Sequence, residues 1–206
     1  MKPEDIYSPE ELKTLIGAVA PASMERSLIM IPALLGLRIG EVLGLTWPAV
    51  DLKNNTLHVR TNLVDLGKEN GGRGLKAPKS KSSRRSLDMP AQLAHELRVW
   101  KLKCPPSEEN FVFCNAEGRP LHRKTAAQIL DAAITGAGIK RRLTLHKLRH
   151  TFASLLLAHG VDLPKVTKLL GHRDSTITLK VYAHFVDDKR NDVQDLATGI
   201  LGRTIT

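Results

Sequence analysis

Apolar residues recur along most of this chain with the spacing of an α-helix, three or four residues apart. The segment Ser8–Glu11 predicts a helix start, because serine can cap the first turn, proline fits the first helical position and acids suit the positive end of the helix dipole. A second helix is expected to end at Gly36, which suits a left-handed cap, and Arg38 to open a third. The predicted helices span about 9–19, 22–35, 38–45, 91–103, 124–135, 145–159, 163–170, 177–185 and 188–198.

Two segments near the middle of the chain are instead typical of β-strands. Thr56–Arg60 alternates between apolar and polar residues, and Arg84–Met89 is expected to pair with it. Between them lies Gly67–Ser83, rich in Gly, Lys and Ser, which we predict to be a mobile basic loop. Phe111–Phe113 should form a short strand or an extended turn. The predicted fold class is therefore mainly α with a small antiparallel β-sheet (α+β).

The composition fits one folded domain, since the chain has 206 residues and 42% of them are hydrophobic. The apolar run at 27–37 is broken by Pro32 and Gly36, and it is shorter than the roughly 18 to 20 residues that a membrane span needs. The N-terminus is polar and acidic, unlike a signal peptide, so we expect a cytoplasmic protein. Cys104 and Cys114 lack a C-x-x-C spacing and are expected to be reduced thiols.

Positive charge is the feature of the composition that points to a partner. The formal net charge is +10, and charge of this size in a small domain favours a polyanion such as nucleic acid. The charge is also clustered: residues 67–85 hold seven Lys or Arg against one acid, and residues 132–161 hold five with no acid. Such clustering indicates a basic face.

The predicted helix at 145–159 carries two polar side chains beside its apolar stripe. His146 and Arg149 are three residues apart and therefore share a helix face, which would suit an anion site. For this pair alone, an ordinary polar face is the better explanation. His146 and His150 would permit a metal, but zinc needs a third ligand and no Cys, His or carboxylate cluster with ligand spacing lies nearby. With no P-loop or dinucleotide fingerprint either, we expect no metal and no cofactor.

Several short motifs occur in an order that resembles the catalytic domain of phage integrases and related tyrosine recombinases. Gly36–Leu45 (Gly-Leu-Arg-Ile-Gly-Glu-Val-Leu-Gly-Leu) is similar to their first arginine box, and His146–Ala153 to their second, H-x-x-R. Leu169–His172 is similar to the third, and Tyr182 follows it by ten residues, the family's usual distance. Pro78–Lys81 resembles the hairpin that carries the family lysine. The resemblance runs from about residue 7 to about residue 185.

This resemblance implies the tyrosine recombinase catalytic-domain fold and a DNA strand-transfer reaction through a 3′-phosphotyrosine intermediate. Tyr182 would be the nucleophile, and Arg38 and Arg149 would clamp the phosphate, since forked guanidiniums suit its oxygens. Lys79 would be the general acid, with Lys81 as the alternative. His146 would help to take the tyrosine's proton, and His172 would donate to a phosphate oxygen. The implied site is Arg38, Lys79, His146, Arg149, His172 and Tyr182.

The resemblance also implies partners and leaves alternatives open. Double-stranded DNA is the expected partner, in a synapse of four protomers, and the chain is expected to be nucleoid-associated when bound. We expect residues 1–206 to form a single catalytic domain, without the core-binding domain that precedes it in the family, and to be a fragment of a longer protein. The stripe of Val193, Leu196, Ile200 and Leu201 would dock on a neighbour or fold back on its own domain. The alternatives are a non-catalytic DNA-binding module and a type IB topoisomerase-like enzyme.

Overall fold

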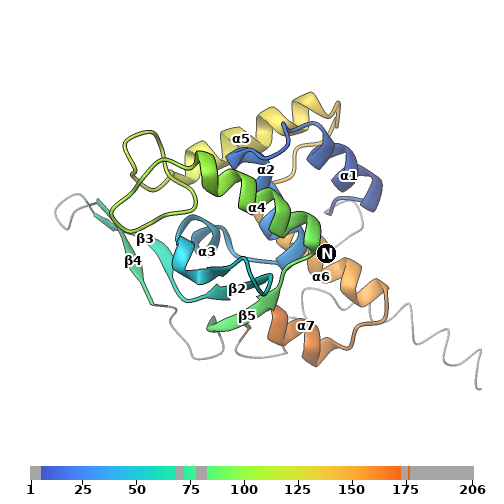
Figure 1. Ribbon diagram of the computed structural model, residues 1–206. Coiled ribbons are helices and arrows are strands. Elements are labelled where there is room, and N and C mark those ends of the chain that lie inside the picture. Colours follow the sequence, from blue (N-terminus) through green and yellow to red (C-terminus); the bar gives the residue numbers. More distant parts are fainter. Residues whose placement is uncertain (1–5, 68–71, 78–82, 173–175, 177–206) are drawn as a thin grey trace, which may run out of the picture.

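The computed structural model describes residues 6–67, 72–77, 83–172 and 176. Helices and strands segregate, with the strands at one side of the molecule and the longer helices packed above and beside them (Figure 1). The helices are α1 (Pro9–Gly17), α2 (Met24–Leu35), α3 (Ile39–Leu43), α4 (Ala91–Lys103), α5 (Arg123–Gly136), α6 (Leu145–Ala158) and α7 (Leu163–Leu170). The strands are β1 (Val50–Asp51), β2 (Thr56–Val59), β3 (Asn62–Gly67), β4 (Gly72–Lys76) and β5 (Arg85–Asp88). The predicted fold class is confirmed.

Local sequence signals account for the helix ends that matter for the site. The Ser8 hydroxyl accepts a hydrogen bond from the Glu11 amide at 3.1 Å, and the Glu11 carboxylate accepts one from the Ser8 amide at 2.8 Å, which completes a capping box. Gly36 ends α2 with a φ of 67°, the left-handed conformation that was predicted. Arg38 is the N-cap residue of α3, so the tight turn at Gly36 leads directly to its side chain.

The predicted pairing of the two strands is confirmed, but the predicted loop between them is partly wrong. The first sheet has the order β1-β2-β5 and is antiparallel, with Leu57 opposite Leu87. Within Gly67–Ser83, residues Gly72–Lys76 form β4 and pair with β3 as a second, two-stranded sheet. The glycines hid this strand, yet Gly74 leaves room for a neighbour, because a Cβ there would lie 2.6 Å from Leu66 Cδ1. The predicted mobility of this loop stays a prediction, since its residues 68–71 and 78–82 lie outside the described residues.

The helix α2 is central to the hydrophobic core. Its residues from Ser27 to Ala33 are all buried, and it packs against α6, α4, α5 and α1. A smaller cluster of Ala153, Leu157, Val166 and Leu170 joins α6 to α7. The buried Tyr7 fastens the segment before α1 to α6: its amide donates to Thr151 Oγ1 at 3.0 Å and its hydroxyl to the Leu143 carbonyl at 3.2 Å. Helix α6 therefore contacts α2, α7 and the segment before α1.

Other expectations have mixed outcomes. Phe111 forms an isolated antiparallel bridge with Thr46, as an extended turn would. Cys104 and Cys114 are both free thiols, with their sulfurs 4.0 Å apart. The helices predicted at 177–185 and 188–198 lie outside the described residues. Among those that are described, no helix has the length and apolarity to cross a membrane.

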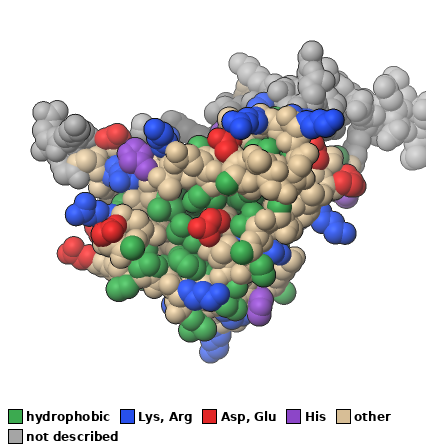
Figure 2. Space-filling model, turned by 90° about the horizontal axis from the view of Figure 1, so that it is seen from above, with side chains coloured by type: hydrophobic (Ala, Val, Ile, Leu, Met, Phe, Trp, Pro, Cys, Tyr) green, Lys and Arg blue, Asp and Glu red, His purple; other side chains and the backbone are tan. Residues whose placement is uncertain are grey.

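Charges of both signs are mixed on one face of the molecule. Figure 2 views the molecule from the side of α5 and shows hydrophobic side chains gathered in the middle of this face, with Lys and Arg interspersed with Asp and Glu around them. This face is therefore not uniformly basic. A polyanion would be attracted more strongly to a face where the acids are fewer.

We expect the Gly36→Ala substitution to lower the free energy of unfolding by about 2 to 4 kcal/mol, the sum of left-handed backbone strain and overpacking. A Cβ at Gly36 would lie 2.5 Å from Phe152 Cδ1 and 3.0 Å from Leu170 Cδ2. Gly138 is the matched control, since its φ is 66° but nothing lies within 4 Å of an added Cβ. Denaturant unfolding should show a clearly smaller loss for Gly138→Ala. Equal losses would mean that the packing around Gly36 relaxes.

Candidate active site

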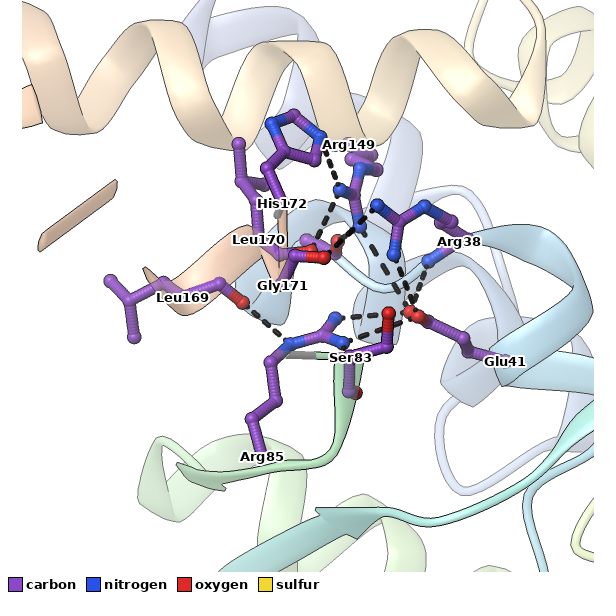
Figure 3. Close-up of polar contacts among 10 residues, drawn as sticks. Arg38, Glu41, Ser83, Arg85, Arg149, Leu169, Leu170, Gly171 and His172 are labelled. Carbon is purple, nitrogen blue, oxygen red and sulfur yellow. Dashed lines mark hydrogen bonds and ion pairs between the residues drawn. The ribbon is translucent and has the colours of Figure 1, made fainter. Parts of the chain in front are cut away.

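Three segments that are distant in the sequence converge where α2, α3, α6 and α7 meet (Figure 3). Arg38 comes from the N-terminus of α3, Arg149 from α6, and His172 from the turn after α7. The structure thus brings together three of the six residues predicted for the site. Lys79 and Tyr182 lie outside the described residues, as does the alternative acid Lys81, so their places in the site stay predictions.

Arg149 is held by the carbonyl groups at two helix ends. It is only 2% exposed. Its Nη1 donates to the Gly36 carbonyl at 2.6 Å and its Nη2 to the Leu170 carbonyl at 2.8 Å. These carbonyls are available because a helix leaves its last carbonyls without partners within the helix. The ends of α2 and α7 therefore fix the direction of this guanidinium.

The contact between Arg149 and His172 fixes the protonation of the histidine. Arg149 Nη2 lies 2.8 Å from His172 Nε2, and because a guanidinium can only donate, Nε2 must be the acceptor. The ring is therefore neutral and carries its proton on Nδ1. Burial, followed by the charges of Arg149 and Arg38, lowers the pKa of His172 to about 4. At neutral pH, His172 can act as a hydrogen-bond donor through Nδ1 without adding charge.

This depressed pKa predicts a loss of stability in mild acid. The folded pKa of about 4 lies below the ordinary 6.5, so the unfolded chain binds more protons between these values and stability falls as pH decreases from about 6.5 towards 4. Because His172 is only partly buried, solvent screening reduces its share to the order of 1 kcal/mol. Denaturant unfolding at pH 7.5 and 5.0 should show a larger decline for the wild type than for His172→Asn. Equal declines in the two proteins would contradict this assignment.

Arg38 differs from Arg149 in being open to solvent. Its side chain is 37% exposed. Its Nη1 donates to Glu41 Oε1 at 2.9 Å and its Nη2 to the Gly171 carbonyl at 3.3 Å. An incoming anion could therefore reach Arg38 while the arginine is already oriented by the protein.

The C-terminal turn of α7 receives one arginine at each of three successive carbonyls. Leu169, Leu170 and Gly171 accept from Arg85, Arg149 and Arg38, respectively. A helix C-terminus carries partial negative charge, which favours cations beside it. This turn therefore reduces the mutual repulsion of three gathered guanidiniums.

Sequence reasoning missed Glu41 and Arg85. Glu41 is 4% exposed; it pairs with Arg38 and Arg85 and lies 3.9 Å from Arg149 Nη1. Burial alone would raise the pKa of its carboxyl, but the hydrogen bond and charge of Arg85, with help from Arg38, hold the pKa below its usual value. The available signal was the spacing, since Glu41 stands three residues after Arg38 inside the first arginine box.

His146 lies on the same helix as Arg149 but at its exposed side. It packs edge-on against His150, with ring centroids 4.4 Å apart. Burial and the charges of Arg149 and Arg38 lower the pKa of His146, so a neutral ring that can accept a proton is favoured at neutral pH. In the described part of the chain, no group of three or more His, Cys, Asp or Glu is placed to hold a metal ion.

Comparison with known proteins finds similar sequences over most of the chain. Residues 6–189 match the phage integrase family. The integrase of Staphylococcus phage L54a is 31% identical over 175 residues, covering 81% of this chain and 49% of that protein. Tyrosine recombinase XerD of Listeria innocua is 32% identical over 191 residues, covering 92% of this chain and 58% of that protein. The chain thus spans about half the length of the curated relatives that it matches.

Solved structures share the fold. The Tn1549 transposon integrase, in complex with circular intermediate DNA, superimposes with a TM-score of 0.77 at 22% identity, over 95% of this chain and 68% of that one. XerH site-specific recombinase, bound to palindromic difH substrate, gives a TM-score of 0.67 at 26% identity, over 96% of this chain and 53% of that one. With the family match over most of its length and this fold, the chain belongs to the phage integrase family of tyrosine recombinases.

Proposed function

We propose that this chain is the catalytic domain of a site-specific DNA recombinase that cleaves and rejoins strands through a 3′-phosphotyrosine intermediate. The observation that carries the proposal is the convergence of Arg38, Arg149 and His172 from three distant segments. Two guanidiniums and a neutral histidine donor suit a phosphodiester, whose non-bridging oxygens gain charge in the transition state.

The proposed reaction combines these groups with the nucleophile and the proton donors that the family resemblance implies. The Tyr182 oxygen attacks phosphorus and forms a phosphotyrosine ester, while the bond to the 5′ oxygen breaks. Neutral His146 would help to take the phenol proton, and Lys79 or Lys81 would give a proton to the departing 5′ oxygen. The ester keeps the energy of the broken bond, so a 5′ hydroxyl can reverse the attack without ATP. Arg38 and Arg149 would offset the charge on the phosphate in both directions.

Double-stranded DNA is the proposed substrate. The net charge of +10 supports a polyanionic partner, and two structural neighbours, the Tn1549 integrase and XerH, are complexes with DNA. We further propose that four protomers form a synapse on two duplexes, with residues after Tyr182 docking on a neighbour, and that the bound protein is nucleoid-associated.

A covalent-trapping experiment tests this function. The chain is incubated with a pool of nicked duplexes of randomised sequence, from which the short fragment next to the cut site diffuses away after cleavage. We expect a DNA–protein adduct that survives denaturation, attached to a 3′ phosphate at Tyr182 by peptide mapping. DNA binding without an adduct would instead support a non-catalytic module. Adduct formation with plasmid relaxation but no strand exchange would favour a topoisomerase-like enzyme.

A further inference from the structure

Arg85 occupies the centre of the contact network although no part of the proposed reaction uses it. It is the first residue of β5, and its side chain is only 6% exposed. Its Nη1 and Nη2 donate to Glu41 Oε1 at 3.2 Å and Oε2 at 3.0 Å, and its Nε donates to the Leu169 carbonyl at 2.6 Å. Figure 3 shows its guanidinium between Glu41 and Leu169, in the last turn of α7. Arg85 is therefore tied both to Glu41 and to the last turn of α7.

The partners of Arg85 are the same two parts of the protein that orient Arg38. Glu41 accepts from Arg38 Nη1, and the α7 turn accepts from Arg38 Nη2 through the Gly171 carbonyl. Arg85 donates from its two terminal nitrogens to the two oxygens of the Glu41 carboxylate. This bidentate geometry fixes the plane of a carboxylate. It also holds the α7 turn two residues before Gly171. Arg85 therefore sets the spacing between the two acceptors that Arg38 bridges.

We infer that Arg85 is a positioning residue for Arg38: it fixes the Glu41 carboxylate and the α7 turn, and through them the direction of the Arg38 guanidinium. This inference rests on the proposed function, in which Arg38 binds the scissile phosphate. Arg85 also donates to the Ser83 carbonyl at 3.2 Å. Ser83 follows Lys81 by two residues, so the same guanidinium holds the backbone directly after the segment that carries both candidate acids.

The charge state of Glu41 gives this role a signature. Burial favours the protonated form of Glu41, and Arg85 is first among the groups that oppose it. Among the described residues, the charged and titratable groups around this carboxylate are Arg38 on α3, Arg85 on β5, Arg149 on α6 and His172 after α7. Without Arg85, Glu41 should take up a proton at a higher pH. A protonated Glu41 would no longer hold Arg38 by a charge-assisted bond.

The test measures the single-turnover rate of adduct formation against pH in Arg85→Gln, with Arg84→Gln as the matched control. Arg84 is the exposed neighbour and loses the same charge. We expect the rate of Arg85→Gln to fall between roughly 10- and 100-fold, the scale of a misplaced reacting group. On acidification, the rate of Arg85→Gln should begin to decline at a higher pH than the wild-type rate does. The DNA affinity of Arg85→Gln should be close to that of Arg84→Gln. Arg85→Lys should restore part of the rate, since Lys keeps the charge without the fork.

A double-mutant cycle shows whether Arg85 acts through Glu41. If it does, Arg85→Gln should add little to the loss of rate caused by Glu41→Gln. Full additivity, or a wild-type rate and pH profile for Arg85→Gln, overturns the inference.

A second experiment, carbon-13 NMR titration of the Glu41 carboxyl in the wild type and in folded Arg85→Lys or Arg85→Gln, needs no DNA. A higher Glu41 pKa in the variants supports the positioning role even if the wild type forms no adduct. The lack of an adduct in the wild type would refute only the proposed function. An unchanged pKa counts against the role.

Discussion

The Tyr182→Phe variant should form no covalent complex with DNA, because phenylalanine lacks the oxygen that would attack phosphorus. DNA affinity should be unchanged, since the loss of one hydroxyl removes no positive charge. The measurement is denaturing gel electrophoresis of the trapped adduct beside a binding titration of the same protein.

The chain supplies its own control for this substitution, because Tyr7 is its other tyrosine. Tyr7→Phe removes the hydrogen bond to the Leu143 carbonyl and should cost about 1 kcal/mol of stability. It should still form the adduct. An adduct in Tyr182→Phe, or its absence only in Tyr7→Phe, would refute Tyr182 as the nucleophile.

The Arg149→Lys variant should cleave DNA at least 100-fold more slowly, which corresponds to about 3 kcal/mol of lost transition-state stabilisation. Lysine keeps the charge but has one nitrogen, which cannot reach the Gly36 and Leu170 carbonyls and His172 in the fixed directions of the guanidinium. The structural loss should also lower the melting temperature. Rates are therefore measured well below the transition, on protein shown to be folded by circular dichroism.

Arg142→Lys is the matched control for this second substitution. Arg142 is exposed and lies just before α6, so the same chemical change there should leave the rate and the stability near those of the wild type. A rate for Arg149→Lys within a few-fold of the Arg142→Lys rate would mean that any cation at this position suffices. The argument from the guanidinium fork would then fail.

Helices and strands were predictable where the spacing of apolar residues agrees with the residues that end an element. The bounds of α4 and α7 match the prediction, because apolar spacing is ended by Cys104-Pro105 in one case and by Gly171 in the other. The β3–β4 hairpin was missed because Gly72 and Gly74 carry no side chain from which a strand pattern can be read. Its stability depends on cross-strand neighbours such as Leu63 opposite Leu75, which only the fold brings together.

The site was predictable as a set of motifs but not as a network. The order of the boxes indicated Arg38, Arg149 and His172 together. Arg85 belongs to a run of basic residues that, as a sequence, indicates contact with a polyanion. Only the fold reveals that its guanidinium turns inward to Glu41. The sequence likewise could not tell that Glu41 is buried, since an acid three residues after an arginine is also typical of an exposed helix start.

The three successive carbonyls of α7 have a consequence for the effect of ionic strength. Salt screens charges that are exposed to solvent, but it screens buried contacts much less. The hydrogen bonds from Arg85 and Arg149 to this turn are shielded from solvent, so counter-ions should not weaken them. Added salt should therefore weaken the capture of DNA steeply, as released counter-ions require, while the cleavage rate of DNA already bound changes little.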